Sequence, residues 1–289
     1  MIKKYKSPLG FYVLSIGIPW TLWFLAGYFS RMEPYTSHME WTTGILSFAG
    51  LLAPVIIALM YILPNRQLKE DLLGRIFNFK SMEAQYILVA FFLMLVSILA
   101  AQAISLLFGY PADQFELRGS FSFTSALFPV WFILIAAPTL EELAWHSYGT
   151  DCLRSRFNLF NASIIFALFW GVWHMPLSTI QGYYHSNLVE SGLIYSINFL
   201  VSLVPLVLIM NWLYYKTGRN IVVAIVFHIT AGVFNEIFAT HPFSKLIQTV
   251  LLIGLAVFLL YRDRDFFFRK DYEESDTRDK NTLKVQETV

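Results

Sequence analysis

The stretch AAPTLEELAWHSYGT, residues 136–150, places two adjacent carboxylates, Glu141 and Glu142, at the end of a strongly apolar run. A charged side chain at membrane depth costs about 2.5–3.5 kcal/mol even on the gentlest insertion scale. Ionisable groups at such positions nearly always face the interior of a helical bundle and pair with one another. The stretch therefore predicts a membrane helix whose acidic side chains belong to an interior polar site.

The composition extends this prediction to the whole chain. Of the 289 residues, 56% are hydrophobic, 17% are aromatic and only 14% are charged, whereas soluble domains carry about 25% charged residues. Apolar segments of spanning length recur as far as residue 262, so we expect one integral membrane domain over residues 1–262. The net charge of +1 argues against a nucleic-acid partner, and membrane lipid is the expected partner of the surface.

Eight membrane spans are predicted, because a bilayer core of about 30 Å needs roughly 20 apolar residues per helix. The expected fold is all-α, a polytopic bundle of about eight transmembrane helices. The fourth helix can continue toward residue 153, and the last span is the shortest. The spans lie near residues 9–29, 43–63, 84–109, 123–145, 159–180, 192–215, 220–239 and 246–262.

The distribution of basic residues supports an even number of spans, since Lys and Arg accumulate on cytoplasmic loops. With the N-terminus inside, 18 of the 21 Lys and Arg residues fall on cytoplasmic segments. Only Arg31, Arg118 and Lys245 fall on the opposite side. We therefore predict that the N- and C-termini are both cytoplasmic.

Two polar segments lie outside the predicted spans. Residues 65–82 mix apolar and basic side chains, a pattern that fits an interfacial amphipathic helix and equally an ordinary loop. Residues 263–289 are charged and lose apolar periodicity after Phe268, which predicts a disordered cytoplasmic tail. Cys152 is the only cysteine, so an intramolecular disulfide and a cysteine zinc site are both excluded.

Few strongly polar groups remain inside the predicted spans, and these are candidates for a single site. Their depths differ by a turn or more at about 1.5 Å of rise per residue, a difference that a helix tilt of about 20° can reconcile. They are Glu141, Glu142 and His146 on the fourth helix, His174 on the fifth, Asn211 on the sixth, and His228, Asn235 and Glu236 on the seventh.

Helical geometry separates the roles of the two glutamates. Neighbouring residues on a helix point in different directions, so Glu141 and Glu142 cannot both face one substrate. Glu142 and His146 are four residues apart and can pair. Glu141 is then free to point into a cavity, on a face that it shares with Trp145 and Tyr148.

A carboxylate and two imidazoles in a water-poor cavity can activate a water molecule. A buried carboxylate suits a general base, and a His or Asn side chain can stabilise a developing oxyanion. Zinc is an open alternative, because Glu141, His174 and His228 are acceptable ligands, although no HExxH motif occurs. A nucleophilic serine or cysteine is less favoured, since Ser147 and Ser163 have no His and Asp partners at the same depth and Cys152 lies beside a cytoplasmic loop.

These residues resemble the motifs of the CPBP family of intramembrane proteases, the CAAX-protease and bacteriocin-processing group that includes the Ras-converting endopeptidase. The resemblance covers about residues 125–240. The family motif EExxxR corresponds to Glu141, Glu142 and His146 in EELAWH, the motif FxxxH to Trp170 and His174 in WGVWH, and the motif HxxxN to His228 and Gly232 in HITAG.

The resemblance implies an endopeptidase in which Glu141 and His174 activate water and His228 stabilises the oxyanion. His146 replaces the family arginine, which keeps a partner for Glu142 but makes its charge depend on pH.

Two other positions also depart from the motifs, because Trp170 replaces a phenylalanine and Gly232 replaces an asparagine. The loss of one oxyanion donor typically costs about 10²- to 10³-fold in rate. The missing donor has two candidate substitutes, Asn235, which shares a helix face with His228, and Asn211 from another helix.

The remaining polar side chains have simpler interpretations. We expect His146 to be structural rather than catalytic. His38, His185 and His241 fall in loops on the side away from the cytoplasm and are expected to be solvated. Glu236 is expected to be an interfacial carboxylate near the outer end of its helix.

The leading functional prediction is an intramembrane endopeptidase acting on a peptide or protein, with prenylated CAAX-like, membrane-associated and peptide-precursor substrates all open. The alternative is a non-catalytic protein of the same fold that acts in immunity or binds a partner, and Gly232 favours it. A proton-coupled carrier is the third class, although the chain shows no pair of broken helices related by an inverted repeat.

Overall fold

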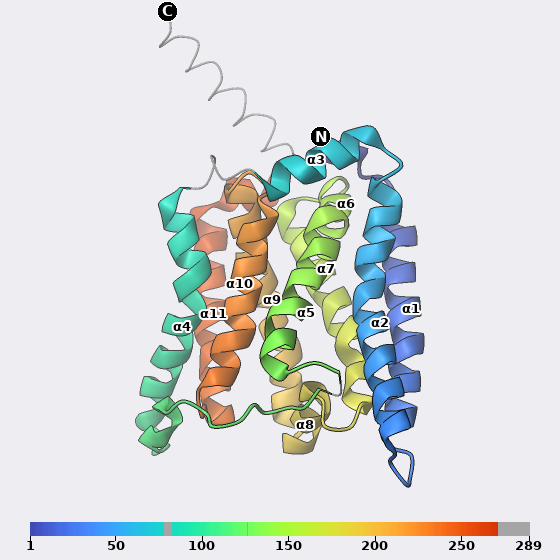
Figure 1. The fold of residues 1–289 in the computed structure, drawn as a ribbon. Coiled ribbons are helices and arrows are strands. Elements are labelled where there is room, and N and C mark those ends of the chain that lie inside the picture. The colour runs from blue at the N-terminus through green and yellow to red at the C-terminus, as the bar shows by residue number, and fades with distance from the viewer. Residues whose placement is uncertain (78–82, 126, 271–289) are drawn as a thin grey trace, which may run out of the picture.

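The computed structural model describes residues 1–77, 83–125 and 127–270. Within them the regular structure is helical, apart from one isolated antiparallel bridge between Leu117 and Phe238. The long helices run side by side along one common direction (Figure 1). A chain surrounded by lipid must satisfy its backbone hydrogen bonds internally, which a helix does within its own segment.

Six helical segments among the described residues are long and apolar enough to cross a membrane. They are α1 (Pro8–Ser30), α2 (Ser37–Ile62), α4 (Ala84–Leu106), α7 (Leu159–His174) with the 3₁₀ turn η4 (Met175–Thr179), α9 (Leu193–Lys216) and α11 (Pro242–Arg262).

Two further segments complete the predicted set. The shorter apolar helix α10 (Ile221–Ile237) packs between α4, α5 and α9. The acidic stretch lies on α5 (Val130–Ala144), which runs through a π-helical turn, η3 (Trp145–Gly149), into α6 (Thr150–Arg154). Each predicted span thus corresponds to one of these helical segments, and the all-α polytopic bundle is confirmed.

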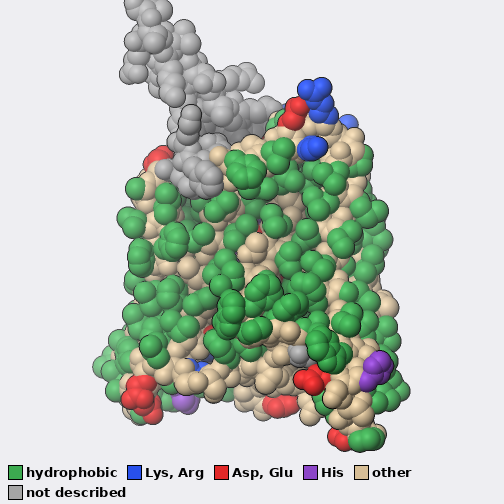
Figure 2. Space-filling model, viewed as in Figure 1, with side chains coloured by type: hydrophobic (Ala, Val, Ile, Leu, Met, Phe, Trp, Pro, Cys, Tyr) green, Lys and Arg blue, Asp and Glu red, His purple; other side chains and the backbone are tan. Residues whose placement is uncertain are grey.

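The outer surface matches a lipid environment. The face shown in Figure 2 is covered by hydrophobic side chains between its two ends, with Lys and Arg mainly at the end that carries α3 and Asp and Glu mainly at the other. Large apolar side chains such as Leu88, Val96 and Phe258 are exposed along the helices. The protein is therefore an integral, multi-pass membrane protein.

Both ends of the described chain lie at one end of the bundle. The Ser155 hydroxyl donates a hydrogen bond to the Tyr5 carbonyl at 3.0 Å, and the Asn158 amide donates to the Phe268 carbonyl at 3.3 Å. We call this the basic end; it carries residues 1–7, α3 (Arg66–Ile76), 155–158 and α12 (Arg264–Phe268). The opposite end carries residues 31–36, 107–125, 127–129, 180–192 and 238–241, including the short helix α8 (Tyr184–Ser191) (Figure 1).

Proline positions explain where the predicted span limits were wrong. The fourth span begins at Val130 rather than near 123, because Pro129 disfavours helical backbone at the residue before it. The last span begins at Pro242 rather than 246, with proline in the first turn and the His241 ring accepting from the Phe243 amide at 3.1 Å. The last span, α11, was predicted to be the shortest, but it has 21 residues, whereas α5 has 15.

The two polar segments are only partly described. The interfacial segment is a helix over Arg66–Ile76, and its remainder, residues 78–82, lies outside the described residues. The segment predicted to be a disordered tail begins instead with α12, whose side chains Phe266 and Phe267 are buried. Residues 271–289 of that prediction lie outside the described residues.

Candidate active site

The helix that carries the two glutamates changes its winding directly after them. The Thr150 amide bonds to the Trp145 carbonyl, five residues back, as in a π-helix. The carbonyls of His146 and Ser147 instead accept hydrogen bonds from the Arg75 guanidinium at 2.7 and 2.8 Å. Such π-turns are frequent at functional sites, and this one is held by a side chain from α3.

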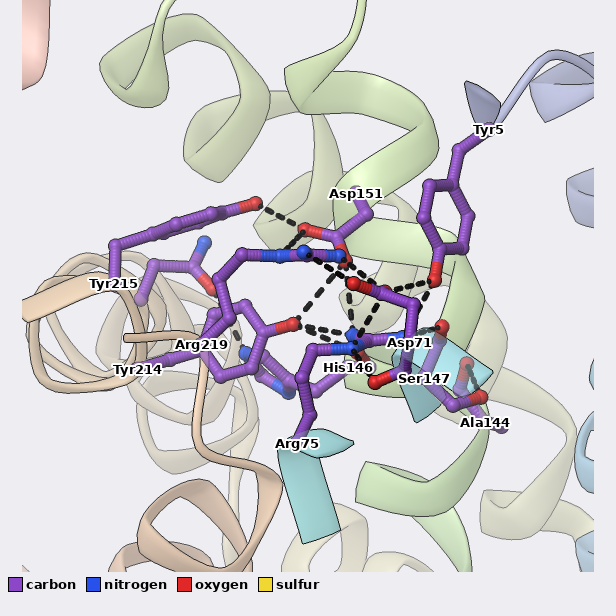
Figure 3. A network of polar contacts seen from close by, with 11 residues as sticks. Tyr5, Asp71, Arg75, Ala144, His146, Ser147, Asp151, Tyr214, Tyr215 and Arg219 are labelled. Carbon is purple, nitrogen blue, oxygen red and sulfur yellow. Dashed lines mark hydrogen bonds and ion pairs between the residues drawn. The ribbon is translucent and has the colours of Figure 1, made fainter. Parts of the chain in front are cut away.

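Arg75 belongs to a buried polar network that closes the basic end below α3 (Figure 3). Its Nη1 atom also donates to Asp151 at 2.9 Å and to the Tyr214 hydroxyl at 2.6 Å. Tyr214 in turn donates to the His146 carbonyl at 3.0 Å. The network therefore fixes the π-turn from two other helices.

A second arginine completes this network (Figure 3). Arg219 pairs with both oxygens of Asp71 at 3.0 and 2.9 Å and also contacts Asp151. The Tyr5 hydroxyl donates to Asp71 at 2.7 Å, and burial raises the pKa of Tyr5, so this donor stays protonated. This cluster could not be predicted beyond the presence of cytoplasmic basic residues, because its members come from five separate segments of the chain.

Glu142 is held between two imidazoles on the other side of the π-turn. Its Oε2 contacts His146 Nδ1, the predicted pairing four residues apart, and its Oε1 lies 2.7 Å from His228 Nδ1. His146 Nε2 lies 2.9 Å from Asn211 Oδ1, and the Asn211 amide donates to the Ser163 hydroxyl at 2.8 Å. Asn211 is thus committed to His146 and does not line either cavity described below.

Trp170 positions the second group of candidates. Its indole N–H donates to Glu141 Oε2 at 2.8 Å, and its carbonyl lies 2.6 Å from His174 Nδ1. A carbonyl only accepts, so Nδ1 carries the hydrogen and Nε2 of the neutral ring presents a lone pair. His174 Nε2 and Glu141 Oε2 are 4.0 Å apart. A phenylalanine at position 170 could not donate to Glu141, so this departure from the motif adds a contact.

The two halves of the site meet around Trp170. Its ring lies 5.3 Å from that of His174 and 5.0 Å from that of His228, centroid to centroid. The predicted residues Glu141, His174 and His228 therefore converge, while Glu142 lies behind His228.

Two cavities open onto this group. The larger, of about 490 Å³, is lined by Glu141, His174, His228, Gly232 and Asn235, among others. The smaller, of about 410 Å³, lies toward α1 and α2 and shares Glu141 and His174 with the first. Residues at the end opposite the basic end contribute to both cavities, with Ser30, Glu33 and Tyr35 in the smaller and Ser122, Asn187 and Lys245 in the larger.

Trp145 and Tyr148 were predicted to share a helix face with Glu141; Trp145 does lie beside the Glu141 carboxylate, whereas the prediction was wrong for Tyr148. Trp145 is fully buried and packs edge-on against Trp173 at 5.3 Å, and Tyr148 stacks on Tyr61 at 5.0 Å. The π-turn begins at Trp145 and shifts the residues after it around the helix axis, so the sequence spacing no longer predicts a common face. These rings anchor the turn to α1 and α2, and neither lines a cavity.

Two side chains of the site were misjudged from the sequence. His185 is not solvated, since its ring stacks on that of His174 at 5.0 Å and both of its nitrogens are buried without a hydrogen-bond partner among the described residues. Glu236 is not an interfacial carboxylate but is 3% exposed and lines the larger cavity. His241 caps α11, whereas His38 is exposed as predicted.

The zinc alternative can be compared with the side-chain arrangement. No group of three His, Cys, Asp or Glu side chains within the described residues is arranged to hold a metal ion. The Nδ1 atoms of His174 and His228 are occupied by Trp170 and Glu142. These bonds leave Nε2 of both rings free, as in histidines that bind a metal, so zinc binding by Glu141, His174 and His228 stays a prediction.

Comparison with known proteins agrees with this geometry. Residues 123–234 match the family model described as type II CAAX prenyl endopeptidase Rce1-like. A curated protein named CAAX prenyl protease 2, from Methanococcus maripaludis, is 34% identical over 273 residues, which cover 93% of this chain and 99% of that protein. The chain therefore belongs to the Rce1-like family of CAAX prenyl endopeptidases, which are membrane proteases.

Proposed function

We propose that this protein is an intramembrane endopeptidase in which Glu141 activates a water molecule for attack on a peptide bond. The observation that carries the proposal is the 4.0 Å separation of Glu141 Oε2 and His174 Nε2 at the junction of two cavities. Both atoms are hydrogen-bond acceptors. One water molecule can donate to both at about 2.8 Å, which leaves its lone pairs free for attack.

The remaining residues fit the steps of hydrolysis. Glu141 takes a proton as the water oxygen bonds to the carbonyl carbon, and it returns that proton to the leaving nitrogen as the C–N bond breaks. General base catalysis of this kind contributes about 10²- to 10⁴-fold. His228, whose Nδ1–H is held by Glu142, can donate from Nε2 to the developing oxyanion as an imidazolium, because both ring nitrogens then carry a hydrogen.

Membership of a protease family implies a peptide or protein substrate, and the membrane fold implies contact with lipid. The relative is named for CAAX prenyl substrates, so a prenylated C-terminal peptide is the first candidate for this chain. The buried position of Glu141 and His174 suits a substrate that partitions into the bilayer before cleavage.

The positions of the cavities indicate from which side of the membrane a substrate reaches the site. Residues at the end opposite the basic end line both of them, while the Arg75 network closes the basic end. Since Lys and Arg accumulate on the cytoplasmic side, we propose that substrates enter from the other side of the membrane or laterally from its outer leaflet.

Cysteine labelling in intact cells tests this orientation. Ser191→Cys at the cavity rim and Lys69→Cys on α3 are placed separately in a Cys152→Ser background, since Cys152 is the only cysteine and is buried. A membrane-impermeant maleimide should label only the Ser191→Cys protein. Labelling of only the Lys69→Cys protein would reverse the assigned side.

Activity is tested with the purified protein in vesicles and two matched peptides, one farnesylated at a CAAX cysteine and one unmodified. Wild-type protein should cleave the farnesylated peptide, and His174→Ala should abolish cleavage while thermal unfolding shows a folded protein. Cleavage by His174→Ala at the wild-type rate would contradict the mechanism.

The non-catalytic alternative is favoured by one feature, Gly232, which stands where the family motif has asparagine. It predicts that wild-type protein cleaves neither peptide, and that Glu141→Gln retains full biological activity in cells.

A further inference from the structure

A second carboxylate lies in the larger cavity, away from the reacting groups. Glu236 is in the last turn of α10, eight residues after His228. At 1.5 Å of rise per residue, the two lie about 12 Å apart along the helix. Both residues line the same cavity as Glu141 and His174.

Only one oxygen of this carboxylate has a partner. Glu236 Oε2 accepts from the Ser122 backbone N–H at 3.1 Å and from the Ser122 hydroxyl at 2.6 Å. Oε1 is buried and has no hydrogen-bond partner among the described residues. A buried, unpartnered carboxylate oxygen is costly to keep, and such an exception requires an explanation, for which a ligand is one.

The surrounding side chains hold the carboxylate in place without neutralising it. The Asn187 amide donates to the Ser122 carbonyl at 2.7 Å and so fixes the loop that binds Oε2. Two cations also line the cavity but are directed elsewhere: Arg118 Nε donates to the Phe238 carbonyl at 3.3 Å, and Lys245 Nζ lies 5.9 Å from the Tyr184 ring centroid. No ion pair with Glu236 is found in the described part of the chain.

We infer that Glu236 forms a subsite that binds a positively charged group of the substrate. The inference rests on the proposed endopeptidase function. An extended peptide advances about 3.3 Å per residue, so 12 Å corresponds to three or four residues from the scissile bond. Two groups of a substrate can supply a cation with N–H donors to Oε1. One is a Lys or Arg side chain at that position, and the other is a free α-ammonium group at that distance.

A peptide mixture tests the subsite directly. Purified protein in vesicles is incubated with peptides randomised on both sides of a fixed centre, prepared with free and with acetylated N-termini, and the products are sequenced by mass spectrometry. Wild-type protein should prefer Lys or Arg three or four residues from the cleaved bond. A preference that disappears on acetylation instead identifies the α-ammonium group as the ligand.

Variants assign this preference to Glu236. Glu236→Gln should lower kcat/KM for the preferred basic peptide about 10- to 100-fold, as expected for loss of a charge-assisted contact, and leave an uncharged peptide unaffected. Glu236→Lys should favour Asp or Glu at the same position. Glu116→Gln removes an exposed carboxylate from the same end of the bundle, outside the cavity, and should keep the wild-type preference.

The outcomes separate the two proposals. Cleavage by wild-type protein without a basic preference, or a preference unchanged in Glu236→Gln, overturns the subsite alone. The absence of any cleavage overturns the endopeptidase function and the subsite with it. If Glu236→Gln fails to fold, Ser122→Ala serves instead, because it removes the hydroxyl bond to Oε2, keeps the backbone N–H bond, and should reduce the same preference without removing the charge.

Discussion

Gly232→Asn should make this protein a faster enzyme. Gly232 lies four residues after His228 on α10, and both line the larger cavity. The structure has room for the new side chain, because the nearest atom to an added Cβ is Leu134 Cδ2 at 3.8 Å, an ordinary van der Waals distance. An asparagine amide there would share the helix face of His228 and restore the family motif.

The expected gain follows from the chemistry of the oxyanion. One well-placed donor is worth about 10²- to 10³-fold in kcat. We therefore expect kcat to rise about 100-fold with little change in KM, because the carbonyl oxygen gains full negative charge only after attack. Asparagine ranks above glycine in helix propensity, so the unfolding temperature should not fall.

Two matched variants isolate the effect of the amide. Gly232→Ala adds the Cβ alone, and Gly232→Leu adds a side chain of similar size without a donor. Rates are measured on a quenched fluorescent peptide in vesicles, beside thermal unfolding of each variant. If Gly232→Asn is no faster than Gly232→Leu, the protein has no missing donor at this position and the reasoning fails.

Three further predictions concern the residues around the site. Arg75→Met removes one of the two arginines that pair with buried Asp151 and the donor to the buried Ser147 carbonyl, so it should lower the free energy of unfolding by about 3–5 kcal/mol. Arg66→Gln, in an exposed pair on the same helix, should not change the unfolding temperature measurably. Trp170→Phe removes the N–H donor to Glu141 and should lower kcat about 10-fold with KM unchanged in steady-state kinetics. His185→Phe removes two unpartnered buried nitrogens, so thermal unfolding should show equal or higher stability; a clear loss of stability would show that these nitrogens are bonded in the folded protein.

The arrangement of spans could be predicted because it depends on length and hydropathy alone. About 20 apolar residues identify a span wherever its neighbours lie. The predicted starts of two spans, near 123 and 246, were wrong. The helices begin at Val130 and Pro242 because their starts depend on proline and on capping contacts. A hydropathy pattern does not register these local features.

The site could be predicted in two respects: the convergence of Glu141, His174 and His228, from the few polar groups inside the spans, and the contacts that one helix determines. The Glu142 and His146 contact follows from their spacing on a single helix. The positions of Asn211, His185 and Glu236 depend on which helices pack together, and the π-turn has no signature in the sequence. Three-dimensional packing therefore added the Asn211 support, the His185 ring beside His174 and the partner-free oxygen of Glu236.

The rate of cleavage by Glu141→Gln is the most direct test of glutamate-activated water. The substitution keeps the size of the side chain and an oxygen that can accept from Trp170, so the fold and peptide binding should be retained. We predict that kcat falls at least about 10³-fold while the Kd for an uncleaved peptide stays within about twofold, an allowance for the change of charge. Cleavage by Glu141→Gln at the wild-type rate would contradict the account.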